Sequence, residues 1–445
     1  MNPKQAFLYT AILYGVFSMH GSNTGLRFMG NEQPVIEIVP DKSTGLEKIY
    51  VLKNLSGVSA AFDGVNTPEN VRWKIFSNLG AGYSIPLSNT HVENGVSIAQ
   101  FMQGNLGYLI EYNDEKYCFW IVDYDTYIFN VDAIKCSEYK DCESTVINVD
   151  GNTFKIPYYS INGVQLSLPR NIRVSYNNLV WNIENNQYEQ EEIVKYYDYI
   201  NNSIALTPPL YCGSKISIRG DMFLDIWNEA KFYESDYIQT HSVTLETRAI
   251  QEDMESGVGN LIGYDIEGLG GSAPCTILFE SYVSDAVAHV EWQMSNDELF
   301  ENITYRSYDA DFKYTFLTEG ITYVRCIASN DDGSCESYGK VFKVEIGDSD
   351  LKIPNVFSPD GDGINDEWKV SYRSLLNFKC WIFDRHGHQV FYTEDPALGW
   401  DGRCNGKVVK SGVYYYVITA TGADGKRYNR NGDINILSSK KYLDR

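Results

Sequence analysis

Histidine and the common catalytic motifs are scarce in this sequence of 445 residues. It has six histidines, no Gly-x-Ser-x-Gly segment and no Cys-x-x-Cys pair. Nucleophilic catalysis needs a base beside the nucleophile, and thioredoxin-like or zinc-ribbon sites need closely spaced cysteines. His386 and His388 share a turn, but we expect no carboxylate or cysteine beside them to complete a metal site. We therefore predict no catalytic residue, no enzyme activity and no cofactor apart from the calcium considered below.

Long apolar runs are missing beyond the N-terminus. Residues 1–22 combine Lys4 with the apolar stretch 6–17, which is typical of a signal peptide and short for a membrane span. A buried first strand is the alternative interpretation, and no small-x-small triplet marks a cleavage site. No later apolar run approaches the ~18 residues of a membrane helix, so we expect an exported chain that is soluble or peripherally held.

Positive charge is in short supply. The chain has 37 lysines and arginines against 59 aspartates and glutamates, a formal net charge of −22. A surface of this sign repels phosphate backbones and anionic headgroups, so nucleic acid is not an expected partner.

Helical periodicity is also rare in this sequence. Residues 187–201 are the one stretch with mixed helical character, and its tyrosine-rich end favours a strand.

Aromatic residues are abundant, with 34 Tyr, 20 Phe and 8 Trp, which predicts many short strands. Three alternating segments are centred on Trp73, Trp181 and Trp292, at spacings of 108 and 111 residues. An Asn-Asp-x-x-x-Cys turn follows the first and third of them. A tryptophan on a central strand is a common core residue of immunoglobulin-like sandwiches. We predict an all-β chain with tandem immunoglobulin-like β-sandwiches at 31–135, 136–245 and 246–348, the last of them PKD-like, with linkers within 246–269 and 348–350.

Nine cysteines in an exported chain indicate disulfides, with one thiol left over. The pairings that we expect are Cys142–Cys212, Cys275–Cys335 and Cys380–Cys404 within modules, and Cys118–Cys136 between a module and a linker. Spacing alone leaves the connectivity open.

Residues 351–445 have a strand and turn pattern of their own. An apolar strand leads through Pro354 into a glycine-punctuated aspartate loop, and turns at 385–388, 399–402 and 424–425 separate further strands. The last of these turns is Asp-Gly, which suits the left-handed geometry of a hairpin. Six or seven short strands in about ninety residues predict a small β-sandwich.

Three blocks of this segment, Ile353–Trp368, Phe383–Phe391 and Gly399–Ile418, resemble the gliding-motility-associated C-terminal domain. That domain is the type B sorting module of the type IX secretion system. Two positions depart from the family, since Asp360 replaces a usual asparagine and His386 a common tryptophan. The resemblance implies export by the type IX machinery and retention on the extracellular face of the outer membrane by a PorP/SprF-type barrel. The motif residues are Pro354, Asn355, Phe357, Pro359, Gly361, Gly363, Asn365, Asp366, Gly387, Trp400, Gly402, Gly412 and Tyr414.

Alternating aspartates in the same loop predict a calcium site. Carboxylates of Asp360, Asp362 and Asp366, with the backbone carbonyl near Ile364, are oxygen ligands at the spacing of short extracellular calcium loops. The loop is not an EF-hand, because its sixth position is Asn365 rather than glycine. The alternative is a turn whose aspartates bond only to their own backbone.

These observations favour a cell-surface protein that acts by binding, with the sandwiches presenting strand edges and loops to a surface protein or glycan. An accessory structural subunit of an outer-membrane assembly is the main alternative. A surface glycan hydrolase is a third, and would need two carboxylates roughly 5–10 Å apart in a cleft.

Overall fold

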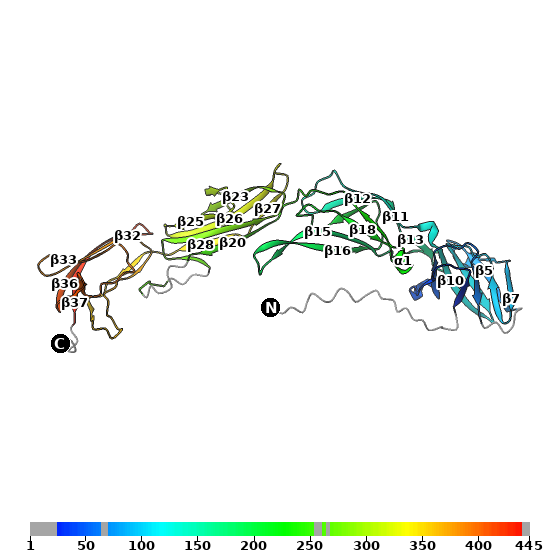
Figure 1. Cartoon of the computed structure of the whole chain (residues 1–445), viewed down its shortest axis with the longest axis horizontal. Coiled ribbons are helices and arrows are strands. Elements are labelled where there is room, and N and C mark those ends of the chain that lie inside the picture. The colour runs from blue at the N-terminus through cyan, green and yellow to red at the C-terminus, as the bar shows by residue number, and fades with distance from the viewer. Residues whose placement is uncertain (1–24, 64–69, 253–259, 264–267, 438–445) are drawn as a thin grey trace. The chain divides into compact units, whose positions relative to one another are not determined.

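The computed structural model of this protein describes residues 25–63, 70–252, 260–263 and 268–437. The predicted signal peptide, 1–22, lies outside the described residues. The chain divides into two compact units, the first made of Met1–Asn178 with Gln190–Thr240 and the second of Leu179–Glu189 with His241–Arg445. Strands dominate both units, as the arrows in Figure 1 show.

The first unit begins with a sandwich of two sheets. The smaller sheet has the strand order β1 (Leu26–Met29), β4 (Ser59–Phe62), β8 (Val96–Ala99), β7 (Thr90–Glu93). The larger sheet has the strand order β2 (Ile36–Ile38), β3 (Lys48–Leu52), β10 (Glu115–Asp123), β9 (Leu106–Tyr112), β5 (Arg72–Phe76), β6 (Ile85–Pro86). Short 3-10 helices, η1 (Lys42–Thr44), η3 (Ala81–Tyr83) and η4 (Tyr124–Tyr127), lie between strands. The predicted Asn113-Asp114 turn joins β9 to β10, and both of its residues have positive φ.

The larger sheet of this sandwich is buried on both faces. Side chains alternate along β10, so Phe119 and Ile121 enter the core between the two sheets, while Trp120 and Val122 enter a second core on the opposite face. Strand β3 pairs in parallel with β10 and alternates in the same way. A run of consecutive apolar residues is what such a doubly covered strand requires.

A second sandwich supplies that opposite core. One sheet has the strand order β11 (Asn130–Cys136), β12 (Thr145–Asn152), β17 (Ser203–Leu206). The other sheet has the order β16 (Gln187–Tyr197), β15 (Ile172–Asn182), β18 (Ser217–Gly220), β19 (Lys231–Glu234). A separate hairpin consists of β13 (Ile156–Tyr159) and β14 (Gln165–Leu168). One short helix, α1 (Met222–Ile226), follows β18. The mixed stretch 187–201 is largely strand β16, as its tyrosine-rich end predicted.

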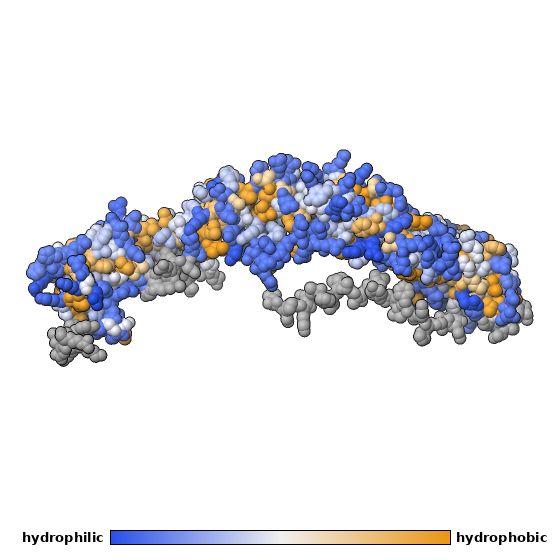
Figure 2. Space-filling view, in the orientation of Figure 1, coloured by the Kyte–Doolittle hydropathy of each residue, from blue (hydrophilic) through white to orange (hydrophobic). Residues whose placement is uncertain are grey.

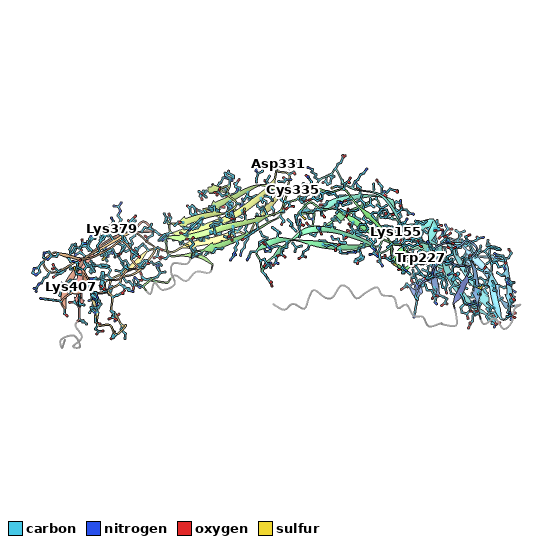
Figure 3. The ribbon with its side chains drawn as sticks, in the orientation of Figure 1. Lys155, Trp227, Asp331, Cys335, Lys379 and Lys407 are labelled. Atoms are coloured by element: carbon cyan, nitrogen blue, oxygen red, sulfur yellow. The ribbon has the colours of Figure 1, made fainter. Side chains whose placement is uncertain are left out.

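The two sandwiches of the first unit are joined by packing and by backbone hydrogen bonds. The ring centroids of Trp120 and Tyr159 are 5.5 Å apart. In the β13–β14 turn, Ile161 N donates to Thr44 O (3.0 Å) and Ile161 O accepts from Ala81 N (2.8 Å). Trp227, labelled in Figure 3, donates from Nε1 to Pro34 O (2.8 Å). A single continuous core therefore connects them.

A buried ion pair lies at the same junction. Arg170 and Asp221 are both fully buried, and Arg170 Nε lies 2.9 Å from Asp221 Oδ2. Asp221 Oδ1 accepts hydrogen bonds from Tyr124 Oη (3.0 Å) and, as the N-cap of α1, from Leu224 N (3.2 Å). Burial raises the pKa of Asp221, and the charge of Arg170 opposes that effect. Tyr124 comes from the first sandwich, so the pair belongs to the joint.

The second unit contains a third sandwich. One sheet has the strand order β20 (Leu245–Gln251), β22 (Cys275–Val283), β25 (Phe312–Phe316). The other has the order β21 (Leu269–Gly271), β28 (Phe342–Ile346), β26 (Gly320–Asn330), β23 (Val287–Ser295), β24 (Ile303–Ser307), and β27 (Glu336–Tyr338) also pairs with β26. Phe279 lies at the centre of its core, with ring centroids 5.6 Å from Trp292 and 5.1 Å from Phe312.

The tryptophan repeat is right for two copies and wrong for the middle one. Trp73 and Trp292 are 3% and 0% exposed in the cores of their sandwiches. Trp181 is only half-buried and packs against Tyr188 of the adjacent strand, with ring centroids 5.2 Å apart. Strand β15 is long enough for Tyr176, 2% exposed, to fill the core position that we assigned to the tryptophan.

The last sandwich also belongs to the second unit. Its main sheet has the strand order β30 (Val356–Phe357), β37 (Arg427–Ile436), β36 (Gly412–Gly422), β32 (Leu375–Phe383), β33 (Gln389–Thr393). Two separate two-stranded sheets complete the sandwich: β29 (Asp350–Lys352) with β31 (Ser371–Arg373), and β34 (Arg403–Cys404) with β35 (Lys407–Val408). The expected Asp424-Gly425 turn joins β36 to β37, where Gly425 N donates to Gly422 O (2.9 Å).

None of the expected disulfide pairings forms. Cys142 and Cys335 are each disulfide-bonded. Free thiols are found at Cys118, Cys136, Cys275, Cys380 and Cys404. Cys212 is also a thiol, and its Sγ lies 3.8 Å from the carbonyl oxygen of Asn177. The reason is strand alternation. Cys380 points into the core of the last sandwich, whereas Cys404 lies in the separate β34–β35 sheet. Cys275 faces the core of the third sandwich opposite Phe316.

On the face shown in Figure 2, hydrophilic residues surround smaller hydrophobic areas. Among the described residues, no helix has the length and apolarity needed to cross a bilayer.

The Arg170–Asp221 pair gives a test of the joint. We expect Arg170→Met or Asp221→Asn alone to lower the free energy of unfolding by about 3–5 kcal/mol, because each leaves a buried group without its partner. The double variant should lose clearly less than the sum of the two. Urea unfolding of the full chain, following the transition of the first unit, measures this. Additive losses would show that the two groups are not coupled.

Candidate functional site

Most of the aromatic motif residues of the C-terminal module build its core. Trp400 is completely buried, with ring centroids 5.5 Å from Phe357 and 5.2 Å from Tyr414. Its backbone N and O each bond with those of Trp368 (2.9 Å). Trp368 Nε1 donates to Pro354 O (2.7 Å), which fixes the start of the aspartate loop. These residues therefore shape the module.

The polar and glycine motif residues form loops around that core. Gly402 has φ of +71° and lies so near Pro359 that an added Cβ would come within 2.9 Å of the proline ring. Asn355 O accepts from Asn435 N (2.8 Å), which ties the start of the module to its last strand. Positive φ is also found at the loop residues Gly361, Gly363, Asn365 and Gly387 and at Gly412, the first residue of the strand β36.

The aspartate loop brings three carboxylates together. Ligand oxygens of Asp360, Asp362 and Asp366 lie within 4.8 Å of one another. Asp366 Oδ1 and Oδ2 accept from the backbone N–H groups of Gly361 (2.6 Å) and Gly363 (2.7 Å), which lower the pKa of Asp366. The exposed Ile364 donates its N–H to Asp362 Oδ1 (2.8 Å). Both features that we weighed are present, clustered oxygens and self-bonded turns, so the calcium site stays a prediction.

An open groove adjoins this loop. Its volume is about 690 Å³. It is lined by Asn260, Lys352, Ile353, Pro354, Val356, Gly363, Asn365, Asp366, Glu367, Lys369 and Ser371. Groups of both signs meet here, and Lys369 Nζ lies 2.8 Å from Glu367 Oε2. The groove is therefore suited to polar contact along the motif loop rather than to an apolar ligand.

The histidine turn between β32 and β33 differs from our expectation. A carboxylate does lie beside it, since Asp384 Oδ2 is 3.1 Å from His388 Nδ1. The backbone N–H of His388, the His388 ring and the backbone N–H of His386 together lower the pKa of Asp384 to about 2. The aspartate thus holds the turn through its backbone bonds, a role that Asp at the start of a tight turn commonly has.

Sequence reasoning missed one contributor to this module, the segment 260–263, which we placed in a linker. Leu261 packs against the core of the C-terminal module and forms a parallel bridge with Tyr372. Tyr372 N donates to Asn260 O (3.0 Å), and Ile262 N donates to Tyr372 O (2.7 Å). Asn260 Nδ2 donates to Val370 O (2.8 Å). The sequence signal was the adjacent apolar pair Leu261-Ile262 within a stretch rich in glycine and acidic residues.

Further bonds dock the module on the third sandwich within the second unit. Ser374 is completely buried; its N–H donates to Ser272 Oγ (2.7 Å) and its Oγ donates to Gly347 O (2.7 Å). Ala423 N donates to Ser374 O (2.9 Å), and the Ala423 side chain lies in the core of the third sandwich. The predicted linker 348–350 therefore lies within a bonded junction.

Comparison with known proteins identifies two segments. Residues 351–436 match the family described as CHU_C Type IX secretion signal domain, which confirms the resemblance seen in the motifs. Residues 135–235 match the family described as Fibronectin type III domain. Fibronectin type III domains share the immunoglobulin-like sandwich architecture. The prediction of an all-β chain of tandem immunoglobulin-like sandwiches is confirmed.

Comparison of the whole chain with solved structures gives only distant similarity. One similar solved structure is a tetra-tandem repeat in the extending region of a large adhesion protein, with 12% identity, coverage of 86% of this chain and 96% of that chain, and a TM-score of 0.21. The three N-terminal domains of the bacteriophage RB49 outer capsid protein Hoc show 8% identity, coverage of 70% of this chain and 100% of that chain, and a TM-score of 0.23. The FN1–FN3 domains of chicken CNTN1 show 10% identity, coverage of 68% of this chain and 97% of that chain, and a TM-score of 0.25. At these identities and scores, they support no conclusion on function. No curated protein matches the chain.

The C-terminal match covers the loop, the aromatic core and every lining residue of the groove except Asn260. A signal of this type indicates export and association with the cell surface. The chain therefore ends in a type IX secretion signal domain, which follows a body of β-sandwiches.

Proposed function

We propose that this protein is a non-enzymatic cell-surface protein that acts by binding. The type IX machinery recognises its C-terminal module, and a PorP/SprF-type barrel retains the module on the extracellular face of the outer membrane. The observation that carries the proposal is the match of 351–436 to a secretion signal domain. The sandwiches upstream support a binding role, because their edges and loops offer contact surface for a protein or glycan.

The boundaries 31–135, 136–245, 246–348 and 351–445 are proposed as the modules of this protein. The grouping of strands into sheets supports four modules, but β1 (Leu26–Met29) joins the first sandwich from before residue 31 and β11 (Asn130–Cys136) joins the second from before residue 136. In this proposal the first two modules act as one rigid body, because Trp120 and its neighbours lie in a core to which both contribute.

We further propose that the working signal is larger than 351–436. Segment 260–263 supplies a β-bridge and an apolar side chain to the C-terminal module, and Ser374 is held by bonds to Ser272 and Gly347. A module that depends on these contacts is presented to the secretion machinery together with the third sandwich.

Deletion of residues 351–445 tests the sorting role. We expect the truncated protein to accumulate in the periplasm, because the element that the outer-membrane step recognises is gone. Fractionation and protease treatment of intact cells measure this, with the full chain in the same strain as control. Truncated protein at the cell surface would contradict the proposal.

Leu261→Asp tests the larger signal. A charge at this position must leave the core of the C-terminal module, so we expect the module to lose about 2 kcal/mol of stability and surface yield to fall several-fold. Limited proteolysis of the purified full chain and surface labelling measure the two effects. Val408→Asp, at a position 59% exposed, is the matched control and should change neither. Normal stability and yield for Leu261→Asp would refute the role of this segment.

We propose a calcium ion bound by Asp360, Asp362 and Asp366 with the carbonyl of Ile364. Calcium prefers such oxygen ligands, and neutralising three neighbouring carboxylates removes their mutual repulsion. We expect calcium to raise the melting temperature of the C-terminal module in the full chain, and Asp362→Asn to reduce the effect. Thermal unfolding with calcium and with chelator measures this. Identical melting of the unchanged protein under both conditions would exclude the site.

A further inference from the structure

A second open groove lies on the second sandwich, where the edges of its two main sheets meet. It has a volume of about 610 Å³. It is lined by Tyr196, Tyr197, Asp198, Tyr199, Asn201, Ser203, Ile204 and Ala205. Strand β16 is the last strand of one sheet and β17 the last strand of the other, and residues of the segment between them also line the groove. None of the sorting motifs contributes to this groove.

Three tyrosines give the groove its character. Tyr196 is 68% exposed, so much of its ring surface is open to solvent. Tyr197 and Tyr199 are half-buried. Lys155, labelled in Figure 3, places its Nζ 4.3 Å from the centroid of the Tyr199 ring, a cation–π contact that holds this ring in position. The groove thus has both a free aromatic ring and a fixed one.

Polar groups stand between the rings with their bonding capacity unused. Within the described residues, the carboxylate of Asp198 and the amide of Asn201 have no side-chain hydrogen-bond partner, although the backbone O of Asp198 accepts from Arg170 N (2.8 Å). Asn202 adopts a left-handed conformation, with φ of 61°, at the turn into β17. Aromatic surface beside a few open acceptors and donors is the composition of a small-ligand site.

A sugar ring matches this composition. It presents a face of C–H groups, which packs on an aromatic ring, and an edge of hydroxyls, which bond to carboxylate and amide groups. Glu191 lies exposed on the same strand, and with Asp198 it disfavours an anionic glycan. An extended peptide paired with the free edge of β17 would use the backbone and leave the tyrosines without a specific role.

We propose that this groove binds a neutral oligosaccharide, with sugar rings packed on Tyr196 and Tyr199 and hydroxyls bonded to Asp198 and Asn201. The inference deepens the proposed binding function by naming the ligand class. It does not depend on export, because purified protein suffices for the test. Failure of secretion and failure of glycan binding are therefore separate results.

Affinity electrophoresis of the purified full chain tests the site. The probes are neutral polysaccharides of stated composition, a β-glucan, a xylan and a galactomannan, with alginate as the anionic counterpart. We expect at least one neutral polymer to retard the protein. Tyr196→Ala should weaken that binding at least tenfold, and Asp198→Asn should weaken it as well.

Tyr139→Ala is the matched control, since Tyr139 is 75% exposed in the same region of the chain but outside the groove. It should bind as the unchanged protein does. The melting temperature of each variant shows whether the fold is retained. Absence of retardation by all three neutral polymers would overturn the proposal. So would equal retardation of the Tyr196→Ala variant, retardation by alginate alone, or a peptide ligand that Tyr196→Ala does not affect.

Discussion

Burial of the larger first sheet on both faces is the constraint on which the body of this protein depends. In β10, Phe119 and Ile121 serve one core while Trp120 and Val122 serve another, so a single strand holds two sandwiches together. The alternation of side chains along a strand allows this, and a shift of one residue would exchange the two sets. The Arg170–Asp221 pair lies at the same junction, where it adds a directional contact to the apolar packing.

The aromatic residues of the C-terminal motif mainly build the fold of their module. Trp400, Phe357 and Tyr414 are buried together, whereas the aspartate loop and the charged groove beside it remain accessible. Aromatic motif positions therefore determine the shape of the module, and the polar groups of the loop stay open to solvent. Leu261, which comes from far upstream in the chain, completes the core of the same module.

Sequence reasoning succeeded where a local rule was sufficient. The turns at Asn113-Asp114 and Asp424-Gly425 followed from their positive-φ residues, and Trp73 and Trp292 followed from strand alternation. It failed at Trp181, because a strand pattern does not show where along a long strand the opposite sheet ends. The tyrosine groove could not be foreseen either, since it arises where two sheet edges meet in space.

The sequence by itself determined the all-β class, the turn positions and the secretion motif, because each depends on residues that are near one another in the chain. Only the tertiary structure decided which faces are buried twice, which cysteines are bonded and which distant segment completes the signal domain. Cys380 and Leu261 illustrate the reason. Whether a thiol meets another thiol, or an apolar residue meets a core, depends on the path of the whole chain, and local preference carries no information about that path.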